Sequence, residues 1–66
     1  MPSIQLDTKK LIGMDEVRAS RLIGVAGGIV NVTIRDGFPL VVNTDFRMNR
    51  INLEIKNGIV VKCYAG

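Results

Sequence analysis

The 66-residue sequence predicts an α+β fold, in which one α-helix packs on a small mixed β-sheet and a long extended loop lies on one edge. The segment 15–26 is typical of a helix, because Asp15 can accept the free N–H groups of a first turn. Apolar and polar residues alternate over 29–35 and 50–64, which is typical of strands with one buried face. An apolar helix stripe and an apolar sheet face have to cover each other, which predicts two layers.

Length and composition bound the function classes. The chain is short enough to be one domain over 1–66, and 47% hydrophobic with 23% charged residues is typical of a globular protein. It has no His and one Cys, so it offers no side-chain zinc or iron–sulfur cage and no histidine base. We therefore expect no enzyme, no cofactor and no metal. The apolar runs fall far short of about 20 residues, which predicts no membrane span and no membrane partner.

The charge pattern indicates a solvated, slightly basic surface. Nine Lys and Arg against six Asp and Glu leave a formal net charge of +3, yet no basic run exceeds two residues. The aromatic residues are Phe38, Phe46 and Tyr64, too few for a base-stacking platform, so we expect no nucleic-acid partner. The unpaired Cys63, and a start at Met1 that begins no secretion signal, favour a cytoplasmic location.

The N-terminal half is expected to hold the helix. Residues 1–10 alternate weakly, which suits an edge strand or a loose arm, and Leu11-Ile12-Gly13 is expected to be an apolar anchor ending in a turn. The helix follows Asp15 and stops at Gly27-Gly28, since glycine readily takes the left-handed conformation at a C-terminus. Its buried stripe is predicted to comprise Val17, Ala19, Leu22, Ile23 and Ala26.

The C-terminal half is expected to form the sheet. A strand over 29–35 would bury its even-numbered residues, and Asp36-Gly37 marks the turn after it. The extended segment 37–45 would then be a crossover between parallel strands. Asn57-Gly58 is a strong hairpin signal, because both residues tolerate positive φ. The hairpin strands are predicted to bury Ile51, Leu53, Ile55, Ile59, Val61 and Cys63, and to point Val60, Lys62 and Tyr64 the other way.

Most of residues 11–66 resembles a known inhibitor fold. The stretch Phe46-Arg47-Met48-Asn49-Arg50-Ile51-Asn52-Leu53, followed by Gly58-Ile59-Val60 and Cys63, is similar to the potato inhibitor I family, and closest to the bacterial and fungal elastase-inhibitor-like peptidase inhibitors. Leu11-Ile12-Gly13 before a capped helix resembles the Leu-x-Gly element of that fold. This chain departs from the family at Asn43, where members commonly have Thr, and in lacking an early Cys, which leaves Cys63 free.

The resemblance implies that the extended connection at 38–47 is a protease-binding loop. Thr44 would lie on the acyl side of the scissile bond and Asp45 on its leaving-group side. Arg50 would brace the loop from beneath, and Asn52 falls where plant members use a second arginine, so both are expected as loop support. The loop residues expected to bind the protease are Val42, Asn43, Thr44, Asp45, Phe46 and Arg47.

The expected function is reversible, substrate-like inhibition of serine proteases of the subtilisin or elastase type. A protease pairs its backbone with an extended segment, and a segment already held extended loses little entropy on docking. Thr44 is small and β-branched, which suits the pockets of such proteases. The alternative is an intracellular protein-interaction module of the same fold without inhibitory activity. A monomer and a homodimer formed through an open strand edge both remain open.

Overall fold

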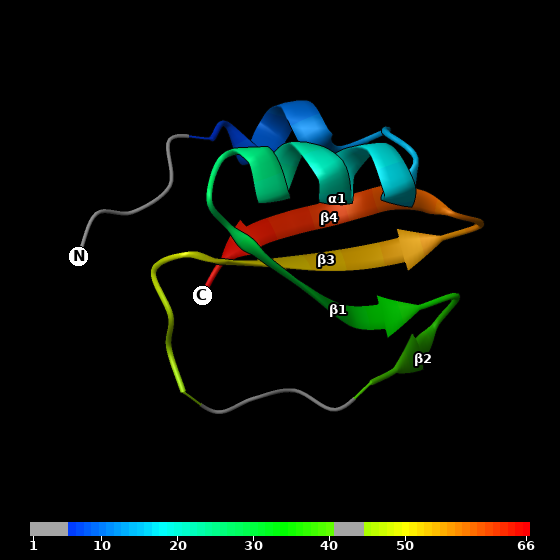
Figure 1. Ribbon diagram of the computed structural model, residues 1–66. Helices are drawn as coiled ribbons and strands as arrows, with labels where there is room; N and C mark the ends of the chain where they lie inside the picture. The colour runs from blue at the N-terminus through cyan, green and yellow to red at the C-terminus, as the bar shows by residue number, and fades with distance from the viewer. Residues whose placement is uncertain (1–5, 41–44) are drawn as a thin grey trace.

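The protein folds as a helix layer over one face of a four-stranded sheet, seen in the computed structural model of Figure 1. The structure describes residues 6–40 and 45–66. This confirms the α+β architecture, while residues 41–44, in the segment predicted to be a long loop, lie outside the described residues. In chain order the elements are η1 (Thr8–Leu11), α1 (Glu16–Val25), β1 (Ile29–Arg35), β2 (Phe38–Pro39), β3 (Arg50–Lys56) and β4 (Ile59–Ala65).

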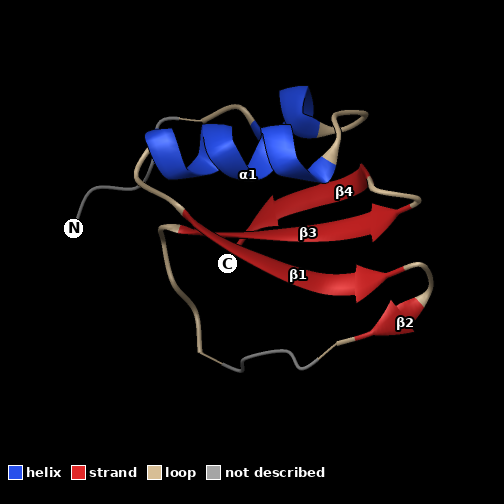
Figure 2. Cartoon of the chain, turned by 45° about the vertical axis from the view of Figure 1, so that its right-hand side comes forward, coloured by secondary structure: helices blue, strands red, loops and turns tan. Residues whose placement is uncertain are grey.

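The sheet has the strand order β2-β1-β3-β4, with a parallel pair at its centre. β1 runs parallel to β3, and Val32 lies opposite Leu53. β2 and β4 run antiparallel to their neighbours. Figure 2 shows the two central arrows pointing the same way, with α1 lying over the sheet. The predicted parallel direction of these two strands is confirmed, whereas part of the predicted crossover segment forms β2 and part lies outside the described residues.

From Thr8 the N-terminal segment differs from the strand or arm that was predicted. Residues 1–5 lie outside the described part, and the chain from Thr8 forms the short 3₁₀ helix η1. The reason is local: the carboxylate of Asp7 accepts a hydrogen bond from the Lys9 N–H at 3.0 Å, which caps the turn. Leu11 is the predicted apolar anchor, with its side chain in the core, and a turn with Gly13 at φ +92° follows it.

α1 begins and ends where its capping chemistry predicts. The Asp15 carboxylate accepts from the Arg18 N–H at 2.9 Å, and Gly27 after the last turn has φ +86°. The predicted stripe is partly wrong, because Val17 is 69% exposed and Leu22 is 39% exposed. At 100° per residue Val17 lies on the solvent side of the helix and Leu22 at the margin of the buried face, whereas the buried Ala19 and Ile23 share that face.

The core lies between the helix layer and the sheet. The central strand β3 contributes most to it, because it has neighbours on both sides and α1 above. Val30, Val32 and Cys63 pack against this core while remaining partly exposed. The fully buried apolar residues are Leu11, Ala19, Ile23, Ile51, Leu53, Ile55 and Val60.

At the start of β4, the residues that point into the core and those that point outward are the reverse of the prediction. Ile55 lies opposite Val60 while Glu54 lies opposite Lys62, so Val61 is an extra residue in the strand. Such a bulge shifts the alternation of side chains by one position. Val60 is therefore fully buried and Val61 is 48% exposed.

The end of the sheet near the two turns is tied together by polar contacts. Arg35 at the end of β1 donates two hydrogen bonds, of 2.6 and 2.7 Å, to the Glu16 carboxylate at the start of α1. That contact holds the pKa of Glu16 below its usual value. The Asp36 carboxylate accepts from the Asn57 N–H at 2.7 Å, which joins the two turns.

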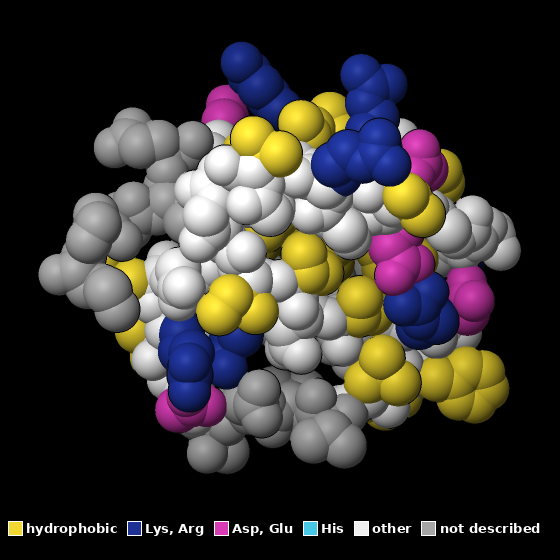
Figure 3. Space-filling model, viewed as in Figure 1, with side chains coloured by type: hydrophobic (Ala, Val, Ile, Leu, Met, Phe, Trp, Pro, Cys, Tyr) yellow, Lys and Arg dark blue, Asp and Glu magenta, His cyan; other side chains and the backbone are white. Residues whose placement is uncertain are grey.

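The surface is mixed in character. Figure 3 shows the Lys and Arg side chains at separated places on the face in view, with carboxylates and apolar side chains between them. None of the helices in the described ranges is long and apolar enough to cross a membrane.

Candidate functional site at the base of the loop

Arg50 is the centre of the candidate site. It is the first residue of β3, and its side chain is only 6% exposed. Side chains alternate along a strand, so Arg50 and Asn52 point to the face opposite the core residue Ile51. Sequence alternation predicted one buried sheet face, yet Arg50 and Asn52 are each 5% exposed, as buried as the apolar face.

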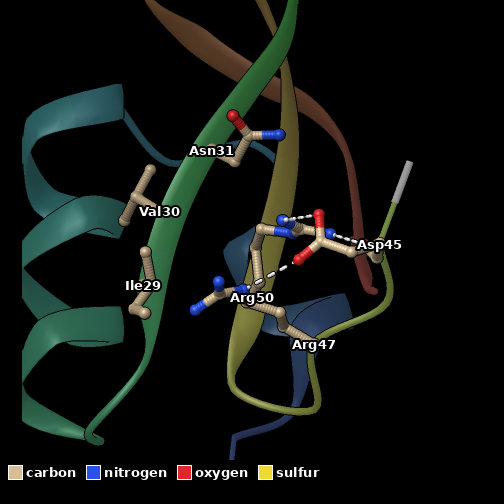
Figure 4. Close-up of a pocket in the computed structure, with 6 residues that line it drawn as sticks. All are labelled: Ile29, Val30, Asn31, Asp45, Arg47 and Arg50. Atoms are coloured by element: carbon tan, nitrogen blue, oxygen red, sulfur yellow. Dashed lines mark hydrogen bonds and ion pairs between the residues drawn. The ribbon is translucent and has the colours of Figure 1, made fainter. Parts of the chain in front are cut away.

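The guanidinium of Arg50 contacts the chain at two distant positions. One terminal nitrogen, Nη2, donates to the backbone oxygen of Asp45 and, at 2.7 Å, to that of Gly66. The other, Nη1, lies 3.5 Å from the Asp45 carboxylate (Figure 4). The planar fork of arginine suits this task, because it presents several N–H groups in fixed directions.

Asp45 is shared between two arginines. Its second carboxylate oxygen accepts a hydrogen bond from the Nε of Arg47 at 3.0 Å. This bond, the backbone N–H of Asp45 itself and the charge of Arg50 hold the pKa of the Asp45 carboxyl below its usual value. The carboxylate is therefore ionised at neutral pH and electrostatically matched to both guanidinium groups.

Backbone hydrogen bonds fix the chain between the loop and β3. The Arg47 N–H donates to the Gly66 oxygen at 3.1 Å, and the Gly66 N–H donates to the Arg50 oxygen at 3.0 Å. The Ile29 N–H donates to the Asn49 oxygen at 2.8 Å, which ties the same segment to β1. The segment that enters β3 is therefore anchored on both sides, to Gly66 and to β1.

Asn52 lies two residues after Arg50 on β3 and contacts the neighbouring strand β1. Its side-chain oxygen accepts a hydrogen bond from the Asn31 amide of β1 at 3.0 Å. Thr33, also on β1, donates to the backbone oxygen of Leu53 at 3.3 Å. In the part of the chain that the structure describes, Asn52 thus holds β1 against β3, and its side chain makes no hydrogen bond to the loop.

The predicted loop residues fall into two groups. Val42, Asn43 and Thr44 lie outside the described residues, so the acyl side of the expected scissile bond has no structural account. Asp45 and Arg47 come together with Arg50, as described above. Phe46 is 73% exposed and so belongs to the surface rather than the core. Beside it lies a hollow of about 300 Å³ lined by Phe46, Arg47, Met48 and Asn49.

Sequence reasoning missed two participants. Gly66 joins the site through its backbone alone, and no sequence signal identifies such a contact. Asn31 does carry a signal, because it is a polar residue on the outward face of a predicted strand, opposite Asn52 in a parallel register. Only the pairing of β1 with β3 turns that signal into a contact.

The described residues offer little reactive chemistry elsewhere. They contain no group of three His, Cys, Asp or Glu side chains placed to hold a metal ion. Cys63 is half-buried, and burial raises the pKa of its thiol, which disfavours the reactive thiolate. At Arg50 the chemistry present is hydrogen bonding to the backbone oxygens of Asp45 and Gly66.

The chain was compared with protein-family models, curated proteins and solved structures, and none of them matches it.

Proposed function

We propose that this protein is a reversible, substrate-like inhibitor of serine proteases of the subtilisin or elastase type, acting through the loop at 38–47. The observation that supports the proposal best is the position of Arg50, buried beneath the loop and donating to the backbone oxygen of Asp45. A brace at that point acts on the residue just after the expected scissile bond, between Thr44 and Asp45.

The chemistry follows from what the brace would hold. The protease serine attacks the Thr44 carbonyl carbon, the Thr44–Asp45 bond breaks, and the Asp45 nitrogen leaves as an amine. Arg50 and Arg47 keep Asp45 in place through its backbone oxygen and its carboxylate. The amine therefore stays beside the acyl-enzyme and re-forms the peptide bond, which releases the serine before water attacks.

Phe46 supports the same proposal from the surface. Its side chain is 73% exposed and directly follows Asp45, so it is available to a protease cleft on the leaving-group side. An aromatic ring in such a position can supply a large apolar contact at low entropic cost.

The test is titration of subtilisin, elastase and chymotrypsin with the purified protein. We expect inhibition of at least one of them at micromolar protein, with slow cleavage confined to the bond between Thr44 and Asp45, as read by mass spectrometry. Arg50→Ala should keep the fold but be cleaved rapidly at that bond. The matched control is Arg21→Ala, which removes an exposed arginine on α1, far from the loop in sequence, and should inhibit like the parent.

Two results would count against the proposal. The first is no inhibition of any of the three proteases by a folded protein, which would favour the interaction-module alternative. The second is an Arg50→Ala variant that resists cleavage as well as the parent, because Arg50 would then not be the residue that keeps Asp45 in place.

A further inference from the structure

A hollow lies beside the arginine pair, and it shares Asp45 and Arg47 with the loop that the proposed function assigns to protease binding. Its volume is about 280 Å³, just below the range of about 300–1,000 Å³ that is typical of ligand pockets and large enough for a small ion. It opens between the start of β1 and the chain leading into β3, as Figure 4 shows. The residues that line it are Ile29, Val30, Asn31, Asp45, Arg47 and Arg50.

The hollow has an excess of hydrogen-bond donors. The Nε of Arg50 is buried and has no hydrogen-bond partner among residues 6–40 and 45–66. Arg47 uses its own Nε to reach Asp45, and no hydrogen bond from its two terminal nitrogens is found within those ranges. A buried N–H without an acceptor is unfavourable, so this site gains from an added acceptor.

The charge of the lining residues also favours an anion. Two guanidinium groups face one carboxylate, which leaves one positive charge uncompensated among the lining residues. The Asp45 carboxylate opposes a second anion, so it should lower the affinity without abolishing it. Ile29 and Val30 give the hollow a partly apolar wall.

We infer that this hollow binds a small oxyanion of the phosphate or sulfate class between Arg47 and Arg50. Such an anion offers several acceptor oxygens to the two planar guanidinium groups. The Arg50 Nε is shielded from solvent, so a lining side chain must shift before an oxygen reaches it. Arg47 is 59% exposed and has the freedom to do so. The inference rests on the geometry of the hollow and stands whether or not the loop inhibits a protease.

The test is a titration of the ¹⁵N-labelled protein with sodium phosphate, sodium sulfate or sodium chloride at matched ionic strength and neutral pH. The readout is the Nε–Hε resonance of each arginine. We expect saturable shifts at Arg47 and Arg50 with phosphate and with sulfate, and none with chloride.

Two variants with opposite expected effects sharpen the test. Arg47→Gln removes charge-assisted hydrogen bonds and should weaken phosphate binding by about tenfold or more. Asp45→Asn removes the competing carboxylate and should strengthen it. The charge-matched controls are Arg21→Gln and Glu54→Gln, which change the net charge by the same amounts away from the hollow and should leave the affinity as it is in the parent.

Three outcomes would overturn the inference. Shifts that grow linearly without saturation would mean that no site exists, and equal shifts with chloride would mean general screening. An Arg21→Gln effect as large as that of Arg47→Gln would mean that net charge, and not the hollow, attracts the anion.

Discussion

Replacing Arg50 with Met should lower the stability of the protein by about 2 kcal/mol. The side chain makes two charge-assisted hydrogen bonds to backbone oxygens, those of Asp45 and Gly66, and such bonds contribute about 1.5–3 kcal/mol each. Against this gross loss of roughly 3–6 kcal/mol, the variant removes an unpartnered buried N–H that costs about 1–3 kcal/mol. Met keeps similar bulk, so no large cavity adds to the loss.

Urea unfolding at neutral pH measures this prediction. A loss of about 2 kcal/mol corresponds to a fall in melting temperature of roughly 8–16 °C for a domain of this size, and should leave the slope of the urea transition unchanged. Arg47→Met is the matched control, because Arg47 is far more exposed and should have a much smaller effect. An Arg50→Met variant as stable as Arg47→Met would refute the reasoning that these buried hydrogen bonds hold the loop base.

Three further predictions follow from burial and charge. The pKa of Asp45 is lowered chiefly by a hydrogen bond from Arg47, so the stabilising contact of the Asp45 carboxylate is complete above pH 3.8 and is lost as the pH falls through the lowered pKa. The hydrogen-exchange protection of the Arg47 amide should fall in that acidic range and stay constant above it. Leu53→Ala, in the fully buried centre of β3, should cost about 2–5 kcal/mol in urea unfolding, whereas Val25→Ala at an 83% exposed position should change the midpoint little. Burial raises the pKa of the Cys63 thiol, so iodoacetamide should alkylate it more slowly in the native protein than in urea, and equal rates would contradict that burial.

The elements that local chemistry dictates could be predicted from the sequence. A carboxylate at Asp15 and a glycine at position 27 define the ends of α1 whatever the rest of the chain does. The turn at Asn57-Gly58 has φ values of +52° and +75°, which these two residue types accept more readily than others. These features depend on a few neighbouring residues, so a pattern of sequence is enough to find them.

The failures in the sheet and in the helix stripe depend on tertiary contacts. The bulge in β4 moves Val60 into the core, and nothing between Ile59 and Cys63 marks the extra residue. Asn52 looks like an exposed strand residue until β1 brings Asn31 beside it. Val17 and Leu22 are apolar enough for a buried stripe, but the direction of α1 over the sheet decides which side of the helix is covered.

The candidate site was only partly accessible to sequence reasoning. The resemblance suggested Arg50 as a support for the loop, and the structure places its guanidinium against Asp45. The contribution of Gly66 is a backbone contact made across sixteen positions of sequence, and it depends on the pairing of β3 with β4. Contacts of that kind become visible only when the strands are assembled.

Because β1 and β3 are parallel, the connection between them must span the length of a strand, and its reach can be compared with that distance. Residues 36–49 must carry the chain back along the length of a seven-residue strand, about 23 Å, although fourteen residues reach about 46 Å when fully stretched. Lengthening such a connection is cheap, since doubling its length adds only about 0.6 kcal/mol of closure entropy. Insertions in this connection should therefore leave the architecture intact, because the hydrogen bonds from Arg50 to Asp45 and Gly66 do not depend on its length.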